Sequence, residues 1–231
     1  MGESSNLLIN PFLYARLPFD PVRDLVPIVL AGSGPLVVVT SSSRPLDSLA
    51  GIAVAARSGA LTYSSSGNGS VGHLTTETWR RSAGIELTHV PYRGGAPAVT
   101  AVATGEVDMQ FASIAAAAPL IAGGQLRALA VTSTSRTAQL PDVPTMVELG
   151  YAGFSSEVIY GLLAPARTPD AVIARVNAEV NRVLELPQLI AGFARRCIDT
   201  RGGSPVSFAA YLAAERMKWS AAVKASGASV D

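Results

Sequence analysis

The sequence is poor in the residues on which several classes of protein depend. It has one cysteine, Cys197, so an internal disulfide and a multi-cysteine metal site are both excluded. Its two histidines, His73 and His89, lack a cysteine or carboxylate partner at zinc-ligand spacing, so we expect no metal site. Charged residues make up only 15% of the chain and the net charge is +1, without a basic block. This composition does not indicate binding to nucleic acid or to an anionic membrane surface.

The chain also lacks a long apolar run, although 48% of its residues are apolar. A membrane-spanning helix needs roughly 18 to 20 consecutive apolar residues. The longest such run, residues 113–123, is shorter and contains Pro119. The first residues, MGESSNLLINPFLYARLPFDP, show neither a basic segment nor a cleavage motif, so no signal peptide is visible. This length and composition predict a globular protein with a sizeable core.

Short β-like runs alternate with helical patterns along the chain, which is typical of an α/β fold. Strands are predicted at residues 35–40, 60–65, 86–92, 107–111, 126–133 and 157–164. Helices are predicted at residues 71–83, 96–104 and 115–122, and within residues 140–151. Two longer helices are expected to begin after the N-caps Thr168 and Ser204. Their predicted buried faces are Val172, Val176, Val180, Val183 and Leu184 in the first, and Phe208, Leu212, Trp219 and Val223 in the second.

The order of these elements predicts two lobes. Residues 44–155 form a self-contained series of alternating strands and helices. The flanks, residues 1–43 and 156–231, are each too small for a domain, so we expect them to pack together as the other lobe. The chain would then cross between the lobes twice.

One stretch concentrates the residues that could bind a ligand. YSSSGNGSVGHL, residues 63–74, reads as a strand end, a glycine- and serine-rich loop and a helix start. Its Gly67-x-Gly69-x-x-Gly72 matches the dinucleotide-binding fingerprint, but that fingerprint also needs an acidic residue about 20 positions later. The next strand ends in VPYR, where only Arg93 could meet a 2′-phosphate. An NADP-dependent oxidoreductase is therefore the alternative interpretation.

The serines and histidines of this stretch also suggest a hydrolase, but the pattern fits poorly. Ser70 does not satisfy the first position of the Gly-x-Ser-x-Gly elbow. His73 follows Ser70 on the expected helix, and Asp108 would orient a base only by accident of the fold. We therefore expect no catalytic triad and no enzyme.

A third interpretation needs no catalyst. A loop of small residues that leads into a helix directs several backbone N–H groups at one place, beside the positive end of the helix dipole. Such a place favours a bound anion. Gly67 and Gly69 let the backbone approach a ligand closely, and Ser64–Ser66 and Ser70 add hydroxyl donors. A small carboxylate is the predicted ligand, and a turn that only caps the helix is the remaining alternative.

Five blocks occur in order along nearly the whole chain. They are INPFLYARLPFDPVRDLVPI, YSSSGNGSVGHL, HVPYRGGAPAVTAVATGEVDMQF, LRALAVTSTSRTAQLPDVPTMVELGY and GLLAPARTPDAVIARVNAEV. Together they resemble the Bug-type (TctC-like) substrate-binding proteins of tripartite tricarboxylate transporters. The resemblance implies an α/β, two-lobed periplasmic-binding-protein (Venus-flytrap) fold that closes around a small carboxylate, such as a di- or tricarboxylate or an amino acid. It also implies a periplasmic monomer without a cofactor, with membrane subunits of the transporter as partners.

The resemblance also implies, position by position, which residues hold the ligand. The loop that corresponds to the carboxylate-binding loop consists of Ser64, Ser65, Ser66, Gly67, Asn68, Gly69 and Ser70. Residues 111–113, which end in Ser113, and the pair Thr132 and Ser133 correspond to contacts at adjacent strand ends. Asp108 belongs to the family's Val-Asp pair, and we expect it to support the end of the sheet rather than to touch the ligand.

The chain departs from the family at its start. Family members begin with a signal peptide, a first strand and a Pro-Phe-x-x-Gly-Gly loop that supplies the other half of the site, and none of these is recognisable here. Residues 2–19 instead resemble an internal family segment that follows a mid-lobe strand. We therefore expect an N-terminally truncated first lobe, and for residues 1–231 alone weak or no carboxylate binding, because binding uses both lobes.

Overall fold

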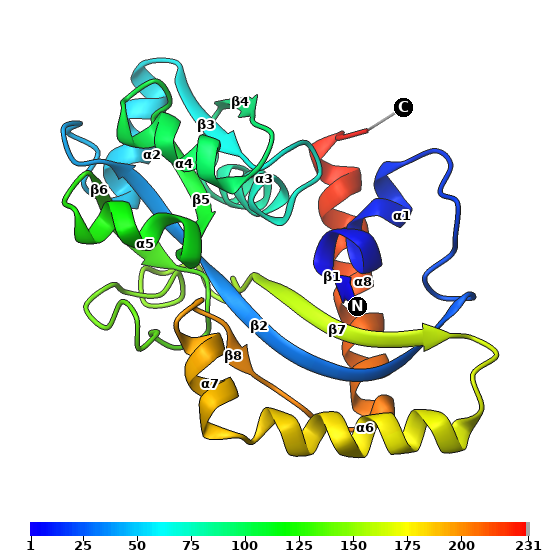
Figure 1. The fold of residues 1–231 in the computed structure, drawn as a ribbon. Coiled ribbons are helices and arrows are strands. Elements are labelled where there is room, and N and C mark those ends of the chain that lie inside the picture. The colour runs from blue at the N-terminus through cyan, green and yellow to red at the C-terminus, as the bar shows by residue number, and fades with distance from the viewer. Residues whose placement is uncertain (230–231) are drawn as a thin grey trace. The chain divides into compact units, whose positions relative to one another are not determined.

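Two compact units make up residues 1–229, which are the residues that the computed structural model describes (Figure 1). Unit 1 consists of Met1–Gly34 and the described residues from Val158 onward, and unit 2 consists of Pro35–Glu157. The chain passes between the units inside strand β2 (Leu25–Ser41) and at the start of strand β7 (Glu157–Pro165). The sequence placed these crossings at 43/44 and 155/156. The assignment of the units to two ligand-binding lobes stays a proposal.

Unit 2 alternates strands and helices. Its strands are the second part of β2, β3 (Leu61–Ser65), β4 (Leu87–Pro91), β5 (Met109–Ser113) and β6 (Leu126–Val131). Its helices are α2 (Leu49–Ser58), α3 (Val71–Ala83), α4 (Gly95–Ala103) and α5 (Ile114–Ala122). Helix α3 was predicted with both of its ends, whereas α2 was not predicted and β2 is much longer than the predicted strand.

The strands of unit 2 bring their C-terminal ends to one edge. β3 is parallel to β4 and β5, with Ser64 opposite Val90 and Gln110. β2 is antiparallel to both β5 and β6, so the order is β6–β2–β5–β3–β4. The strands β3, β4, β5 and β6 therefore all end at the edge where β2 enters the unit, at Leu36.

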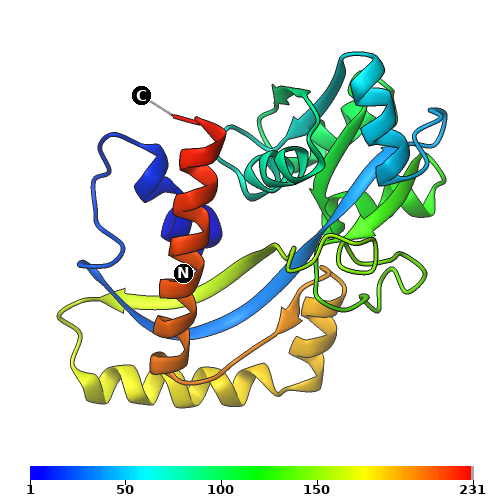
Figure 2. The same cartoon turned by 180° about the vertical axis from the view of Figure 1, so that it is seen from behind.

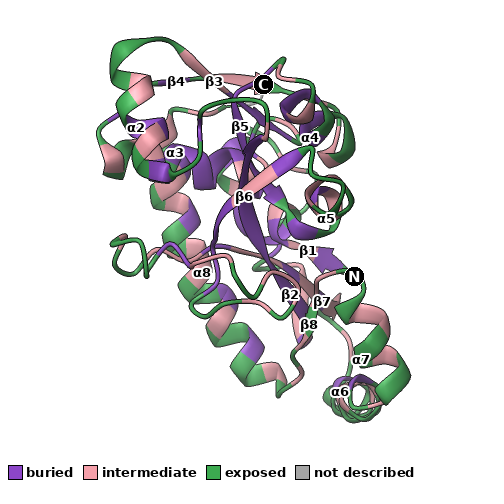
Figure 3. Cartoon of the chain, turned by 90° about the vertical axis from the view of Figure 1, so that its left-hand side faces the viewer, coloured by how far each residue is buried: buried purple, intermediate pink, exposed green. Residues whose placement is uncertain are grey.

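The core of unit 2 lies on its central strands. Leu36, Val37, Val38 and Val39 are consecutive and none is more than 2% exposed. Because neighbouring strand residues face opposite sides, both faces of β2 must be covered there. Figure 3 shows the buried residues gathered on these strands, with α2 and α3 on one face and α4 and α5 on the other.

Unit 1 contains the long strand β7, the first part of β2 and two very short strands, together with short and long helices (Figure 2). Strand β1 (Gly2–Glu3) pairs with β7, and β8 (Asp199–Thr200) pairs with the first part of β2, both antiparallel. The helical elements are the short π-helix η1 (Ser5–Ile9), α1 (Asn10–Leu13), α6 (Asp170–Leu184), α7 (Pro187–Ala194) and α8 (Pro205–Ser226). The prediction for α8 is confirmed: Ser204 accepts the Ser207 N–H as the N-cap, and all four predicted core side chains are buried.

Helix α6 corrects two predictions. Its N-cap is Pro169 rather than Thr168, because Pro169 is extended, with ψ 140°, and the helix begins only at Asp170. The predicted face is confirmed at Leu184, which is buried, and at Val176 and Val180, which pack beside it. It is wrong at Val172 and Val183, which are 47% and 38% exposed, and the buried Ile173 was missed.

The helix predicted within residues 140–151 was wrong, because this segment forms turns. Pro141 and Pro144 lack the N–H that a helix interior needs. The segment instead runs beside the end of β6, where Val131 donates to Pro144 O at 2.9 Å and accepts the Met146 N–H at 3.0 Å.

Candidate functional site

Three helices begin where the parallel strands of unit 2 end. A short loop joins β3 to α3, another joins β4 to α4, and β5 passes directly into α5. The first N–H groups of a helix have no acceptor within it and carry its positive end. We call this edge, residues 65–71, 91–95, 113–114 and 131–133, the strand-end edge. At this edge α3 covers one face of the sheet, and α4 and α5 cover the other (Figure 3). Open α/β sheets bind their ligands at strand ends where neighbouring connections leave to opposite faces.

The loop Ser66–Ser70 forms a tight turn onto α3. Gly67 and Gly69 have φ values of 139° and 72°, a region that glycine enters without strain. The Ser70 N–H donates to Gly67 O at 3.1 Å, and Ser70 Oγ accepts the His73 N–H at 3.3 Å as the N-cap of α3. The side chains of Ser66 and Asn68 are exposed on this turn. The loop therefore caps the helix and presents a polar tip at the same time.

The hydroxyl groups of Ser64 and Ser65 are turned into the protein. Both residues are completely buried. Ser64 Oγ donates to Ala98 O at 3.0 Å, and Ser65 Oγ lies 2.7 Å from His89 Nε2 and 3.0 Å from Gly67 O. Through these contacts the two hydroxyls hold the loop in place. The proposal of a ligand contact therefore rests on Ser66–Ser70 rather than on these two side chains.

Ser113 and Thr132 lie on either side of Leu36 at the strand-end edge. Ser113 is exposed, and its hydroxyl makes no capping bond to α5. Thr132 is completely buried, and its hydroxyl accepts the Leu36 N–H at 2.8 Å and donates to Ser156 O at 2.5 Å. The hydroxyl of Thr132 is therefore occupied by the protein itself.

The neighbouring Ser133 is the better candidate for a ligand contact. It is only 9% exposed, and its Oγ has no hydrogen-bond partner within residues 1–229. Buried polar groups are normally paired, so an unpaired hydroxyl beside a proposed site is available to a ligand. The sequence analysis placed both Thr132 and Ser133 among the strand-end contacts, and within residues 1–229 only the Ser133 hydroxyl lacks a partner.

The third glycine of the Gly67-x-Gly69-x-x-Gly72 triplet serves packing. A Cβ at Gly72 would lie 2.5 Å from Phe111 O, so α3 can approach β5 this closely only with glycine there. The loop after β4 holds an exposed Arg93 and no carboxylate. A dinucleotide site needs that carboxylate for the ribose. The local geometry therefore explains the triplet without a nucleotide.

Neither histidine is placed as a catalytic base. His73 is buried in the first turn of α3, where its Nδ1 accepts the Gly69 N–H at 3.0 Å. His89 contacts Ser65, a serine that no substrate can reach because it is completely buried. Burial lowers the pKa of His89 to about 4 and also lowers the pKa of His73, so both rings are neutral at pH 7.

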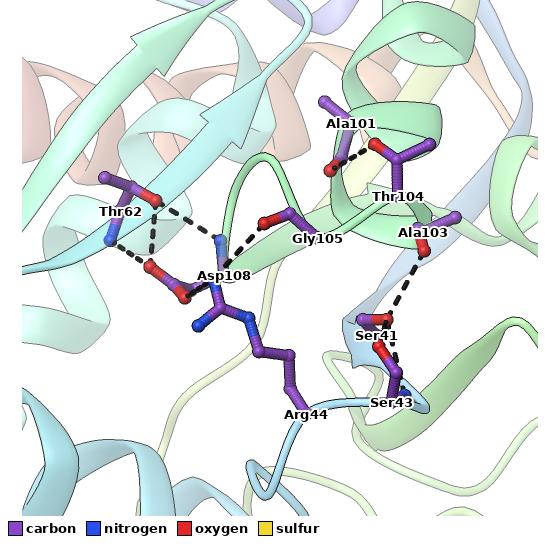
Figure 4. A network of polar contacts seen from close by, with 9 residues as sticks. All are labelled: Ser41, Ser43, Arg44, Thr62, Ala101, Ala103, Thr104, Gly105 and Asp108. Carbon is purple, nitrogen blue, oxygen red and sulfur yellow. Dashed lines mark hydrogen bonds and ion pairs between the residues drawn. The ribbon is translucent and has the colours of Figure 1, made fainter.

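The opposite end of the same sheet holds a closed polar network (Figure 4). Asp108 Oδ2 accepts the N–H and the hydroxyl of Thr62 at 2.8 and 2.9 Å. Asp108 Oδ1 pairs with Arg44 at 2.9 Å, and Arg44 also donates to Gly105 O at 3.2 Å. We call these four residues the sheet-start network. The prediction that Asp108 supports the end of the sheet is confirmed.

Residues 1–229 contain neither a membrane-spanning helix nor a cluster of metal-ligating side chains. No helix there combines the length and the apolar character that crossing a bilayer requires. Histidine, cysteine, aspartate and glutamate side chains do not gather in threes in that part of the chain, as they would around a metal ion.

Known proteins were compared with the chain. The TctC family model, described as the tripartite tricarboxylate transporter family receptor, matches residues 1–228. The chain is 37% identical to the UPF0065 protein in the tcbD-tcbE intergenic region of a Pseudomonas species, over 94% of this chain and 66% of that protein. It is 31% identical to Protein BugT of Bordetella pertussis, over 98% of this chain and 70% of that protein. The structure of an R. palustris protein with adipate aligns with a TM-score of 0.89 and 30% identity, over 99% of this chain and 77% of that one.

These matches confirm the predicted α/β periplasmic-binding-protein fold and give no support to the oxidoreductase alternative. The chain spans about two thirds of the length of the two curated relatives. The truncation of the first lobe stays a prediction. The family-model match extends over almost the whole chain, and this protein belongs to the tripartite tricarboxylate transporter receptor family.

Proposed function

We propose that this protein is an extracytoplasmic solute-binding protein that captures a small carboxylate, and that the strand-end edge supplies one side of its binding site. The observation that carries the proposal is the start of three helices at the ends of β3, β4 and β5, in a chain of this receptor family. The related R. palustris protein was solved with adipate, which supports a dicarboxylate as the class of ligand.

The proposed mechanism is electrostatic and changes no covalent bond. The N–H groups of Gly67, Gly69 and Ser70 are bonded within the loop, so the first N–H groups of α3 donate to the carboxylate oxygens. Such charge-assisted bonds are roughly twice as strong as neutral ones. Ser113, at the end of the neighbouring strand β5, and Ser133, which follows β6 on the far side of β2, add hydroxyl donors. Closure of a second lobe over the ligand then completes the site, as in other two-lobed binding proteins.

We further infer the setting in which this binding takes place. The family description as a transporter receptor supports a periplasmic location and delivery of the carboxylate to membrane subunits of a tripartite transporter. Binding by a monomer is sufficient for this role. Isolated residues 1–231 are expected to bind weakly, because they provide the strand-end edge but only part of the length of the relatives.

Saturation-transfer NMR tests the proposal because it detects weak ligands. Adipate at millimolar concentration should receive magnetisation from the protein at pH about 7.5, where both of its carboxyl groups are ionised. The matched control is 1,6-hexanediol, which has the same chain length without the charges, and it should give no signal. NADPH provides a third arm. Transfer to NADPH but not to adipate, or equal transfer to adipate and to the diol, would overturn the proposal.

A further inference from the structure

His73 closes the turn that precedes α3. It is the third residue of that helix, and its N–H donates to Ser70 Oγ at 3.3 Å. Its side chain reaches back, and Nδ1 accepts the Gly69 N–H at 3.0 Å. This arrangement resembles a capping box, in which a glutamate or glutamine at this helix position accepts the N–H of the N-cap residue. Here the side chain accepts the N–H of Gly69, one residue before the N-cap Ser70. In this protein the acceptor is an imidazole.

A second ring holds the other end of the same loop. His89 Nε2 lies 2.7 Å from Ser65 Oγ, and that oxygen also accepts the Gly67 N–H at 3.2 Å. The rings of His73 and His89 are stacked, with centroids 4.0 Å apart and planes 9° apart. The ring of Tyr63 stacks on His89 at 4.8 Å. Both ends of the loop are thus tied to one group of stacked rings.

The charged groups around these rings are paired with each other. Glu77, one turn further along α3, accepts the Tyr63 hydroxyl and pairs with Arg80, each at 2.7 Å. Arg80 also pairs with Glu86, which precedes β4, at 2.9 Å. Burial alone would raise the pKa of Glu77, but the hydrogen bonds from Arg80 and Tyr63 hold it below its usual value. The negative charge near the rings is therefore already balanced by Arg80.

This environment keeps the acceptor nitrogen of His73 unprotonated. Burial lowers the pKa of His73, against an opposing effect of the Glu77 carboxylate. Burial and then the neighbouring His73 lower the pKa of His89. Two stacked imidazolium ions at this separation would also repel each other. At neutral pH both rings are neutral, and Nδ1 of His73 keeps the lone pair that the Gly69 N–H needs.

Resting on the proposed function, we propose that His73 is a positioning residue of the carboxylate site, which shapes the loop Ser66–Ser70 through Gly69 without placing a negative charge beside the ligand. A carboxylate in the same place would cap the loop equally well and stabilise the helix start. It would also repel an anion bound at that helix start. A neutral acceptor satisfies the loop and leaves the positive end of α3 available to the ligand.

The proposal predicts opposite behaviour for two isosteric variants. His73→Asn and His73→Asp each place an oxygen where Nδ1 lies, and they differ only in charge. Amide shifts of 15N-labelled protein, titrated with adipate at pH about 7.5, give the dissociation constant. Relative to the wild type, binding should stay within about threefold in His73→Asn and weaken about tenfold in His73→Asp. The difference should shrink as salt is added.

A second readout needs no ligand. Protonated imidazole has no acceptor nitrogen, so the Gly69 N–H loses its partner in acid. The Gly69 amide resonance of the ligand-free wild type should therefore move as the pH falls from about 7 to about 4.5, below the usual histidine range. In His73→Asn it should stay nearly constant. Urea unfolding of each variant at neutral pH confirms that the fold is retained.

The outcomes separate this inference from the proposed function. If the wild type binds adipate and both variants bind it equally well, or both lose it equally, the function stands and the role of His73 is overturned. A wild-type Gly69 resonance that stays constant while the His73 ring resonances show protonation overturns that role as well. If the wild type shows no adipate-dependent shifts, the proposed function fails and the positioning role fails with it.

Discussion

The two ends of the sheet in unit 2 are built from similar polar residues and differ in whether those residues satisfy each other. In the sheet-start network, Asp108, Thr62 and Arg44 are bonded to one another and to the backbone. At the strand-end edge, Ser113 is exposed and Ser133 is buried without a partner within residues 1–229. Mutually satisfied polar groups stabilise a fold, whereas unsatisfied ones cost stability and remain available to a ligand. This contrast supports the proposed location of the binding site at the strand-end edge.

The largest expected effect tests whether the strand-end edge depends on close packing. Gly72→Val would force α3 away from β5, because even a Cβ would lie 2.5 Å from Phe111 O. The free energy of unfolding should fall by about 3 kcal/mol, as in other overpacked cores. Urea denaturation measures it. The matched control is Gly95→Ala, where the new Cβ meets the Ala116 Cβ at an ordinary 3.7 Å, and it should not destabilise. Equal stability of both variants would contradict this packing.

A somewhat smaller loss is expected at the sheet-start network. Asp108→Ala leaves the Thr62 N–H and the Arg44 guanidinium without their partner, and should cost about 2 kcal/mol in urea unfolding. Asp108→Asn, which keeps an acceptor for Thr62, should cost less. Because this network lies at the far end of the strands, adipate affinity should not change in either variant. A selective loss of affinity in Asp108→Asn at full stability would erase the contrast between the two ends.

The stability of the fold should depend on pH through the stacked histidines. Unfolded histidine titrates near pH 6.5, whereas the pKa of His73 is lowered and that of His89 is lowered to about 4 in the fold. Between these values the unfolded state binds more protons, so the free energy of unfolding should fall as the pH falls from 6.5 towards 4. Urea midpoints across this window measure it. The double variant with His73→Asn and His89→Gln should show a flatter profile, and an unchanged slope would refute the assignment.

The smallest stability effect is expected where the hydroxyl has no internal partner. Ser133→Ala should leave the free energy of unfolding within about 0.5 kcal/mol of the wild type. Thr132→Val, one residue earlier, should lose about 1 to 2 kcal/mol, because its hydroxyl bonds both Leu36 and Ser156. Adipate binding should weaken in Ser133→Ala. If instead Ser133→Ala is the less stable of the two variants, the Ser133 hydroxyl has a structural role, and its proposed contact with the ligand is contradicted.

The sequence was sufficient where short-range chemistry decides the structure. Helix α3 was predicted with both ends because Ser70 is a good N-cap, and Gly84 follows the helix in the left-handed conformation. The role of Asp108 was predicted through a family resemblance and is confirmed by its contacts with Thr62 and Arg44. The α/β class of unit 2 was also predicted, because strands and helices alternate along it, whereas the strand order β6–β2–β5–β3–β4 was not.

The sequence was insufficient where the local structure depends on contacts with residues that are distant in the chain. The inward hydroxyls of Ser64 and Ser65 depend on Ala98 and His89, which belong to other elements. The stacking of His73 on His89 joins α3 to β4, and no pattern in the sequence around either histidine indicates it. Residues 140–151 carried a helix-like pattern, but hydrogen bonds to Val131 hold them as turns. Tertiary contacts override local preference in each case.

The contrast between the two ends is tested most directly by mapping amide shifts of 15N-labelled protein during one adipate titration. Saturable shifts are predicted at the strand-end edge, at Gly67, Gly69, Ser113 and Ser133, with no change at Thr62 and Asp108 in the sheet-start network. Shifts centred on the sheet-start network, or spread evenly over both ends, would contradict the account.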